Sequence, residues 1–183
     1  ARLIEDIARF LERRDWYAAH GIPWRRGYLL DGAPGTGKSS LIFAMAGHFN
    51  KPIYVIQPSM VINDNALHQA LNEAGSGFVV IEDADSFSVA RERKPAVVVN
   101  GVTSGSPYGE EGDVTLSGLL NAIDGIASEE GRILFVTSNH SDMLDAALLR
   151  PGRIDRRETL PLADAAVARA MFASFFPDAS PDA

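Results

Sequence analysis

Apolar residues at the start of the chain recur at the spacing of an α-helix: Leu3, Ile4, Ile7, Phe10 and Leu11. This pattern is typical of an amphipathic helix that buries one face. We predict a helix to about Arg14, which ends before the breaking segment Gly21-Ile22-Pro23.

Short apolar runs alternate with helical stretches over the rest of the chain. The predicted strands are Tyr28–Leu30, Ile53–Ile56, Phe78–Ile81, Ile133–Thr137 and a shorter Glu158–Leu160. The predicted helices are Leu41–Phe49, Asp64–Leu71, Leu116–Ile126 and Asp164–Phe176. Strands that alternate with helices predict an α/β fold, in which helices cover both faces of a parallel sheet.

One segment, residues 88–115, fits neither pattern. It contains the basic residues Arg91, Arg93 and Lys94, then Val97-Val98-Val99, then glycine, serine and acidic residues. A stretch of this length inside a compact domain predicts a long mobile loop, with at most a transient strand.

Composition narrows the class of protein. The chain has 183 residues, which suits one domain, and its net charge of -7 argues against a surface that coats nucleic acid. It has no cysteine, which rules out disulfides and thiolate metal sites, and its histidines show no ligand spacing. No apolar run is long enough to span a bilayer. The chain reads as part of a longer protein, so we expect any membrane segment to lie outside it.

A glycine-rich segment stands between the first strand and the next helix: Gly32-Ala33-Pro34-Gly35-Thr36-Gly37-Lys38-Ser39. It matches the phosphate-binding P-loop pattern. Glycines let successive backbone N–H groups turn toward phosphates, and the helix N-terminus adds further donors. Lys38 would bridge the β- and γ-phosphates, Ser39 would offer a hydroxyl to Mg²⁺, and Ser40 extends the nucleotide-binding set. Asp31 is unexpected beside an anionic ligand, so we expect its side chain to point away.

The third strand ends in the acidic sequence Glu82-Asp83-Ala84-Asp85. In a P-loop site one carboxylate serves the Mg²⁺ shell and the next orients the attacking water. By position, Glu82 faces the metal and Asp83 faces the water. The residue types are reversed from the commoner order, in which Asp comes first and Glu second. Asp83 is one methylene shorter than Glu, so it would need a water chain or a different loop. The alternative is a turn cluster at a strand end, and Asp85 is expected to be structural.

The fourth strand ends in Thr137-Ser138-Asn139. Asn139 could hold the attacking water and sense the γ-phosphate, or it could simply form a turn. Farther along, Pro151-Gly152 forces a sharp turn between Arg150 and Arg153. We expect both guanidinium groups to project outward, where an arginine can stabilise phosphoryl transfer in a neighbouring subunit. The alternative is a pair of surface arginines.

With these residues in place, the chain resembles the AAA ATPases from about Ile4 to Phe176. The motifs that carry the resemblance follow the order of the family: Gly32–Ser39, Glu82-Asp83, Asn139 and Leu149-Arg150-Pro151-Gly152-Arg153-Ile154-Asp155. Within the family it is most similar to the branch of mitochondrial inner-membrane translocases that mature the Rieske iron–sulfur protein of complex III, or to bacterial relatives. The stretches that indicate this branch are Arg25–Leu30, the inverted acidic pair, Leu116–Gly125 and Thr137-Ser138-Asn139-His140.

The resemblance implies a three-layer P-loop sandwich with a five-stranded parallel sheet. Residues 1–161 would form the large ATPase subdomain, and residues 162–183 the first helix and tail of a truncated C-terminal lid. It also implies ATP or ADP with Mg²⁺, and a homo-oligomeric ring, a hexamer or a heptamer, with a protein substrate. Asp83 becomes the base, Asn139 the sensor, and Arg150 and Arg153 the fingers that reach a neighbour's nucleotide. Gly21 and Ile22 are expected to border the adenine.

One departure concerns the region Gln57–Asp64, where threading members of the family carry an aromatic pore loop. This chain has no aromatic residue there, which favours a folded cargo. The leading hypothesis is Mg²⁺-dependent ATP hydrolysis that drives protein translocation, remodelling or complex assembly. Two alternatives remain: an ATP-gated scaffold with little turnover, and a DNA-linked AAA ATPase, which the acidic charge disfavours.

Overall fold

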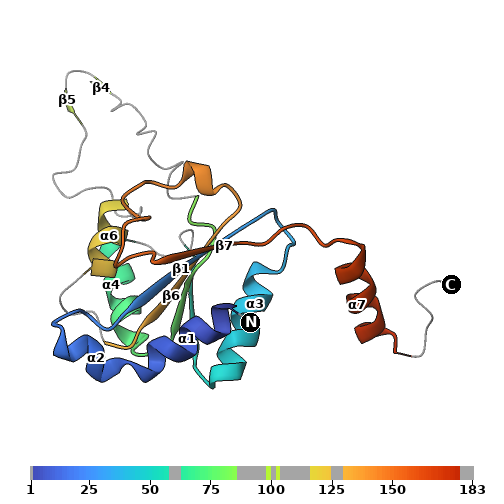
Figure 1. Ribbon diagram of the computed structural model, residues 1–183. Coiled ribbons are helices and arrows are strands. Elements are labelled where there is room, and N and C mark those ends of the chain that lie inside the picture. The colour runs from blue at the N-terminus through green and yellow to red at the C-terminus, as the bar shows by residue number, and fades with distance from the viewer. Residues whose placement is uncertain are drawn as a thin grey trace.

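The computed structural model describes residues 2–57, 63–85, 98–99, 102–103, 116–124 and 130–177. Its centre is a five-stranded parallel sheet in the order β2-β3-β6-β1-β7 (Figure 1). The strands are β1 Arg26–Asp31, β2 Ile53–Ile56, β3 Phe78–Ile81, β6 Ile133–Ser138 and β7 Arg156–Thr159. Two short strands, β4 Val98–Val99 and β5 Val102–Thr103, form a separate antiparallel pair. The predicted five-stranded parallel fold is confirmed.

The helices also follow the predicted order. They are α1 Arg2–Glu12, α2 Arg14–Ala19, α3 Lys38–Phe49, α4 Asp64–Glu73, α6 Leu116–Asp124 and α7 Ala165–Phe175, with a 3₁₀ turn, η2, at Ser141–Met143. Ile126 and nearly all of the predicted 88–115 loop lie outside the described residues. The predicted N-terminal helix, to about Arg14, corresponds to α1, which ends at Glu12, whereas the separate helix α2 was not predicted.

The boundaries of β7 also differ from the prediction. The apolar pattern predicts Glu158–Leu160, whereas the strand is Arg156–Thr159. Its side chains alternate between half-buried and exposed because it is an edge strand. An edge strand can therefore consist largely of polar residues, so an apolar run in the sequence does not reveal the residue at which β7 begins.

Each face of the sheet packs against its own pair of helices. On one face Leu29, Val79 and Val136 pack against apolar residues of α4 and α6. On the other face Tyr28 and Phe135 pack against α1 and α3. Neighbouring strand residues face opposite sides, so nearly continuous apolar strands supply both cores.

The last described helix, α7, stands apart from these layers. It has no buried residue, and in Figure 1 it lies away from the helices that cover the sheet. The Asp164 carboxylate caps it by accepting a 2.8 Å hydrogen bond from the Val167 N–H. Its assignment to a C-terminal lid stays a prediction. Within the described residues, no helix combines the length and apolar character needed to cross a membrane.

A partly buried polar network ties α1 to the sheet. The Asp6 carboxylate accepts hydrogen bonds from the Arg26 guanidinium, the closest at 3.0 Å, and from the Tyr28 hydroxyl at 2.8 Å. Arg156 of β7 lies 3.4 Å from the same carboxylate. Burial opposes ionisation of Asp6, but the Tyr28 hydrogen bond and the charge of Arg26 outweigh it, so the pKa of Asp6 is lowered.

We predict that Asp6→Asn lowers the free energy of unfolding by about 1.5–3 kcal/mol, because hydrogen bonds to a charged group are lost and two arginines lose their counter-ion. In the parent chain, the lowered pKa means that the unfolded state binds more protons as the pH falls below about 4, so this contribution is lost on acidification. Urea unfolding at neutral pH and near pH 3 measures both effects. Glu5→Gln, an exposed site on the same helix, should change stability by less than about 0.5 kcal/mol. If Asp6→Asn and Glu5→Gln lowered the free energy of unfolding equally, the stabilising role of the Asp6 network would be contradicted.

Candidate functional site

The P-loop lies at the carboxyl edge of the sheet, between β1 and α3. Gly35 and Gly37 adopt positive φ angles of 79° and 91°, and an added Cβ at either position would point into open space. The loop borders a cavity of about 420 Å³. The residues that line it come from three segments: Pro34, Gly35, Gly37, Lys38, Ser39, Ser40, Glu82, Asp83, Thr137 and Asn139. The structure therefore brings together most of the predicted site. Gly32, Ala33 and Thr36 belong to the loop without lining this cavity.

Lys38 is the buried cation of the site, with a relative exposure of 8%. Its ammonium group donates to the carbonyl oxygens of Gly32, at 2.7 Å, and Ala33, at 3.0 Å. It also donates to the Asn139 amide oxygen at 2.8 Å. Lys38 thus joins the P-loop to the end of β6.

The Ser39 hydroxyl and the Glu82 carboxylate face each other. Ser39 Oγ donates to Glu82 Oε1 at 2.8 Å, across the gap between the start of α3 and the end of β3. The second Glu82 oxygen accepts from the Gln57 amide at 3.1 Å. Sequence reasoning did not single out Gln57, because a lone Gln after a strand carries no motif.

Asp83 lies next to Asn139, and its backbone is unusual. Its φ of 49° places a non-glycine residue in the left-handed region, which costs energy and is seen mainly where surrounding contacts enforce it. Those contacts come from Thr137, whose hydroxyl accepts from the Asp83 N–H at 3.2 Å, and from Asn139, whose amide donates to the Asp83 carboxylate at 3.2 Å. Asn139 therefore contacts both Lys38 and Asp83, more than a turn-forming role requires.

The geometry fits a nucleotide with Mg²⁺. Gly37 supplies no side-chain cap to α3, so the first N–H groups of this helix remain as donors at the cavity. A serine hydroxyl beside one carboxylate suits Mg²⁺, which takes oxygen ligands and usually few protein groups. In the described part of the chain, no group of three or more His or acidic residues could hold a metal alone. The Ser39 hydroxyl and the Glu82 carboxylate are therefore a partial set of Mg²⁺ ligands, which the phosphates of the substrate would complete.

The arginine pair lies at the opposite, amino edge of the sheet. Asp155 fixes its turn: one carboxylate oxygen accepts from the Gly27 N–H of β1 at 2.9 Å and the other from the Gly152 N–H at 3.0 Å. A Cβ on Gly27 would fall 1.6 Å from the Arg153 carbonyl oxygen, so only glycine allows this close approach. The turn packs against β1, far from the P-loop cavity of the same chain.

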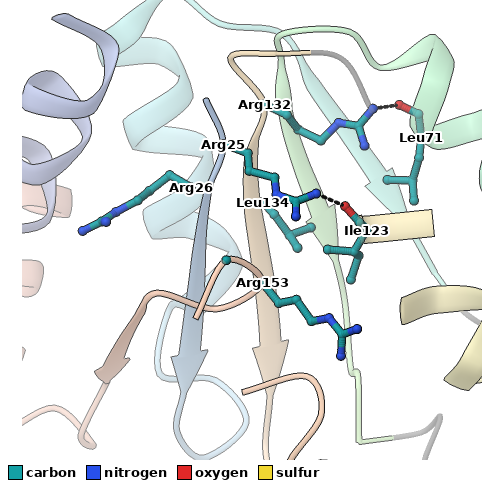
Figure 2. Close-up of a pocket in the computed structure, with 8 residues that line it drawn as sticks. Arg25, Arg26, Leu71, Ile123, Arg132, Leu134 and Arg153 are labelled. Carbon is teal, nitrogen blue, oxygen red and sulfur yellow. Dashed lines mark hydrogen bonds between the residues drawn. The ribbon is translucent and has the colours of Figure 1, made fainter. Parts of the chain in front are cut away.

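Arg150 and Arg153 differ in exposure. Arg150 is exposed, as expected. The expectation that Arg153 projects outward is wrong: its side chain is 16% exposed and borders a small pocket with Arg25 and Ile123 (Figure 2). Arg153 Nε donates to Asp124 at 2.7 Å, and another of its nitrogens donates to the Ala147 carbonyl at 2.6 Å. Its partner Asp124 lies at the end of α6, and the spacing of residues along the chain does not predict this pairing.

Gly21 and Ile22 are not brought to the cavity. They follow α2, and the next residues lead to the amino end of β1, where the Trp24 carbonyl accepts from the Gly131 N–H just before β6. The six residues of β1 separate this edge from the P-loop. That they border the adenine stays a prediction.

Asp31 and Asp85 serve structural contacts. Asp31 does not line the cavity, and its carboxylate accepts from Arg157 of β7 at 2.9 Å. This contact explains how an acid is tolerated next to the P-loop. Asp85 accepts from the Ser138 hydroxyl at 3.2 Å, as its expected structural role requires.

Comparisons with known proteins agree with this geometry. The sequence profile described as "ATPase family associated with various cellular activities (AAA)" matches residues 28–162. The human protein named mitochondrial chaperone BCS1 is 41% identical over 182 residues, which cover 98% of this chain and 42% of that protein. A Dictyostelium discoideum protein, probable mitochondrial chaperone BCS1-A, is 43% identical over 179 residues, or 96% of this chain and 41% of that protein.

Similarity also extends beyond proteins of that name. The Arabidopsis thaliana protein HYPER-SENSITIVITY-RELATED 4 is 44% identical over 164 residues, which cover 84% of this chain and 27% of that protein. The chain thus spans less than half the length of these relatives. The profile covers most of the chain and includes the P-loop, the acidic pair, Asn139 and the arginine turn. The chain belongs to the AAA family of ATPases.

Proposed function

We propose that this chain is the catalytic module of a AAA ring ATPase, which hydrolyses ATP with Mg²⁺ to drive protein translocation, remodelling or complex assembly. The observation that carries the proposal is the pair of contacts across the cavity, Ser39 with Glu82 and Asn139 with both Lys38 and Asp83. These contacts bring a cation, a metal-ligand pair and a candidate base to one place. A glycine-rich turn without a nucleotide role would not need them.

Each side chain has a distinct task in this proposal. Lys38 binds the β- and γ-phosphates, and Ser39 and Glu82 would hold Mg²⁺, which neutralises charge on the phosphates when bound. Asp83 orients a water molecule and takes its proton, while Asn139 fixes the position of Asp83 and of the γ-phosphate. Because Asp83 is exposed at the cavity, it can reach a water there despite its short side chain.

A neighbouring subunit completes the site in this proposal. Arg150 and Arg153 lie at the amino edge of the sheet, so neither can reach the P-loop of its own chain. An exposed Arg150 suits contact with a neighbour's nucleotide in a head-to-tail ring, a hexamer or a heptamer. Arg153 stays a predicted second finger, and it would first have to leave Asp124.

The relatives suggest a biological setting. Several are named as mitochondrial chaperones, so we propose a protein substrate for the full protein. We propose the matrix side of the inner membrane as its place in a eukaryotic cell and the cytoplasm in a bacterial one. No nucleic-acid partner is proposed.

The first prediction of the proposed function concerns nucleotide binding. Lys38→Ala should weaken binding of a fluorescent ADP about 10- to 100-fold, because a buried charge-assisted contact to phosphate is lost. Fluorescence titration measures it. Lys51→Ala, beyond the far end of α3, is the matched control and should bind ADP as the parent chain does. If Lys38→Ala bound ADP with unchanged affinity, the assignment of the P-loop as the phosphate-binding site would be wrong.

The second prediction separates an enzyme from an ATP-gated scaffold. Asp83→Asn should lower kcat by about 10²–10⁴ through loss of the base, with ADP affinity retained. Steady-state phosphate release measures the rate, with the exposed Asp15→Asn as control. If the parent chain turned over as slowly as Asp83→Asn while still binding ATP, the scaffold would be the better function.

The third prediction concerns the trans arginine. Specific activity should rise with protein concentration, and Arg150→Ala should lower the rate at saturating protein by about 10³–10⁵. A mixture of Asp83→Asn and Arg150→Ala chains should regain activity, because in a mixed ring about a quarter of the interfaces pair an intact base with an intact arginine. Activity independent of concentration, with no recovery on mixing, would point to a self-contained site.

A further inference from the structure

Asp31, like Asp85, is an acid at this edge that the proposed P-loop chemistry does not use. It ends β1, immediately before the loop, and its side chain is only 14% exposed. The Arg157 guanidinium donates to its carboxylate at 2.9 Å. Burial works against ionisation, but hydrogen bonds from Arg157 and Ser141 outweigh it and lower the pKa of Asp31. The carboxylate is therefore held as an anion by two partners.

These partners come from two other elements. Arg157 belongs to β7, which pairs with β1 and leads toward α7. Ser141 opens η2, the turn that follows β6, and it is 8% exposed. The same Arg157 nitrogen also donates to the Ser141 hydroxyl. Asp31, Arg157 and Ser141 thus form a three-membered cluster, which joins β1, β7 and the turn after β6.

Asn139 lies just before the turn that this cluster fixes. Only His140 separates Asn139 from Ser141. The start of the turn is held by the Ser138 hydroxyl, which accepts from the His140 N–H at 3.0 Å and donates to Asp85. Ser141 supplies the anchor on the other side of Asn139. The amide of Asn139 meets Lys38 at 2.8 Å and Asp83 at 3.2 Å, so a small shift of the turn would break both contacts.

We propose that Asp31 is a positioning residue that acts through Arg157 and Ser141 to place Asn139 against the γ-phosphate. This inference rests on the proposed function, because it needs Asn139 to sense that phosphate. The negative charge of the Asp31 carboxylate beside the P-loop is neutralised by Arg157. The hydrogen bonds of this carboxylate direct it toward the turn and away from the cavity. A neutral residue at this position would leave the turn without that anchor.

Binding of two nucleotides tests the proposal without relying on turnover. The affinities of fluorescent ADP and of the non-hydrolysable β,γ-imido ATP analogue are measured for the parent chain, Asp31→Asn, Asn139→Ala and the double variant. Asp31→Asn should reduce the preference for the ATP analogue over ADP by on the order of three- to tenfold, with ADP affinity unchanged. In the Asn139→Ala background, Asp31→Asn should have no further effect. Glu158→Gln removes a carboxylate of β7 that pairs with Arg156, and it should leave the preference intact.

The outcomes separate this inference from the proposed function. Loss of preference in Asn139→Ala but not in Asp31→Asn would overturn the positioning role and leave the ATPase proposal standing. No change of preference in Asn139→Ala would overturn the positioning role together with the assignment of Asn139 as the γ-phosphate sensor. Equal weakening of the two nucleotides by Asp31→Asn would mean a merely structural role. If Asp31→Asn does not fold, Arg157→Lys replaces it, since a lysine keeps the charge but cannot hold both partners with one planar group.

Discussion

The parallel pairing of β1, β3 and β6 is the constraint on which the rest of the site depends. Because the three strands run side by side in register, their carboxyl ends meet at one edge of the sheet. Three segments distant in sequence therefore end together: the P-loop after β1, Glu82 and Asp83 after β3, and Asn139 after β6. The buried apolar side chains on both faces hold the strands in register, and a slip of one residue would reverse the direction of every side chain. The two hydrophobic cores are thus what position the polar site.

Several carboxylates gather at the carboxyl edge of the sheet, and each of them accepts a hydrogen bond from its own partner. Glu82 is held by Ser39 and Gln57, Asp83 by Asn139, Asp85 by Ser138 and Asp31 by Arg157. Each acid accepts from a donor that fixes its direction, so like charges can share one edge without competing for the same partner. The φ of Asp83 shows that this arrangement costs backbone strain at the residue that we propose as the base. A shorter acid in a left-handed conformation is one way for the inverted Glu-Asp order to keep a carboxylate at the cavity.

The sequence predicted the features that local pattern controls. Three apolar β-branched strands, the glycine-rich loop and the acidic pair follow from short-range rules, and the structure places them together. Contacts between distant segments could not be read from the chain. Asp124 pairs with Arg153, and Asp155 bonds Gly27, only because folding brings α6 and β1 to the arginine turn. Gly21 and Ile22 do not line the P-loop cavity, because β1 carries the chain from one edge of the sheet to the other, and that they border the adenine stays a prediction.

The position of Arg153 has an energetic consequence for assembly. A partly buried guanidinium that forms charge-assisted hydrogen bonds with a carboxylate is costly to remove, since each such bond contributes about 1.5–3 kcal/mol. A neighbour's phosphates would have to compensate for that loss before Arg153 could serve as a finger, whereas Arg150 is already exposed. Removing Arg153 would also leave Asp124 and the Ala147 carbonyl without this donor, although Arg25 lies 3.7 Å from the same carboxylate. Loss of activity on substitution of Arg153 would therefore mix a catalytic effect with a structural one. Arg150 is the position at which a contribution in trans can be separated from the stability of the fold.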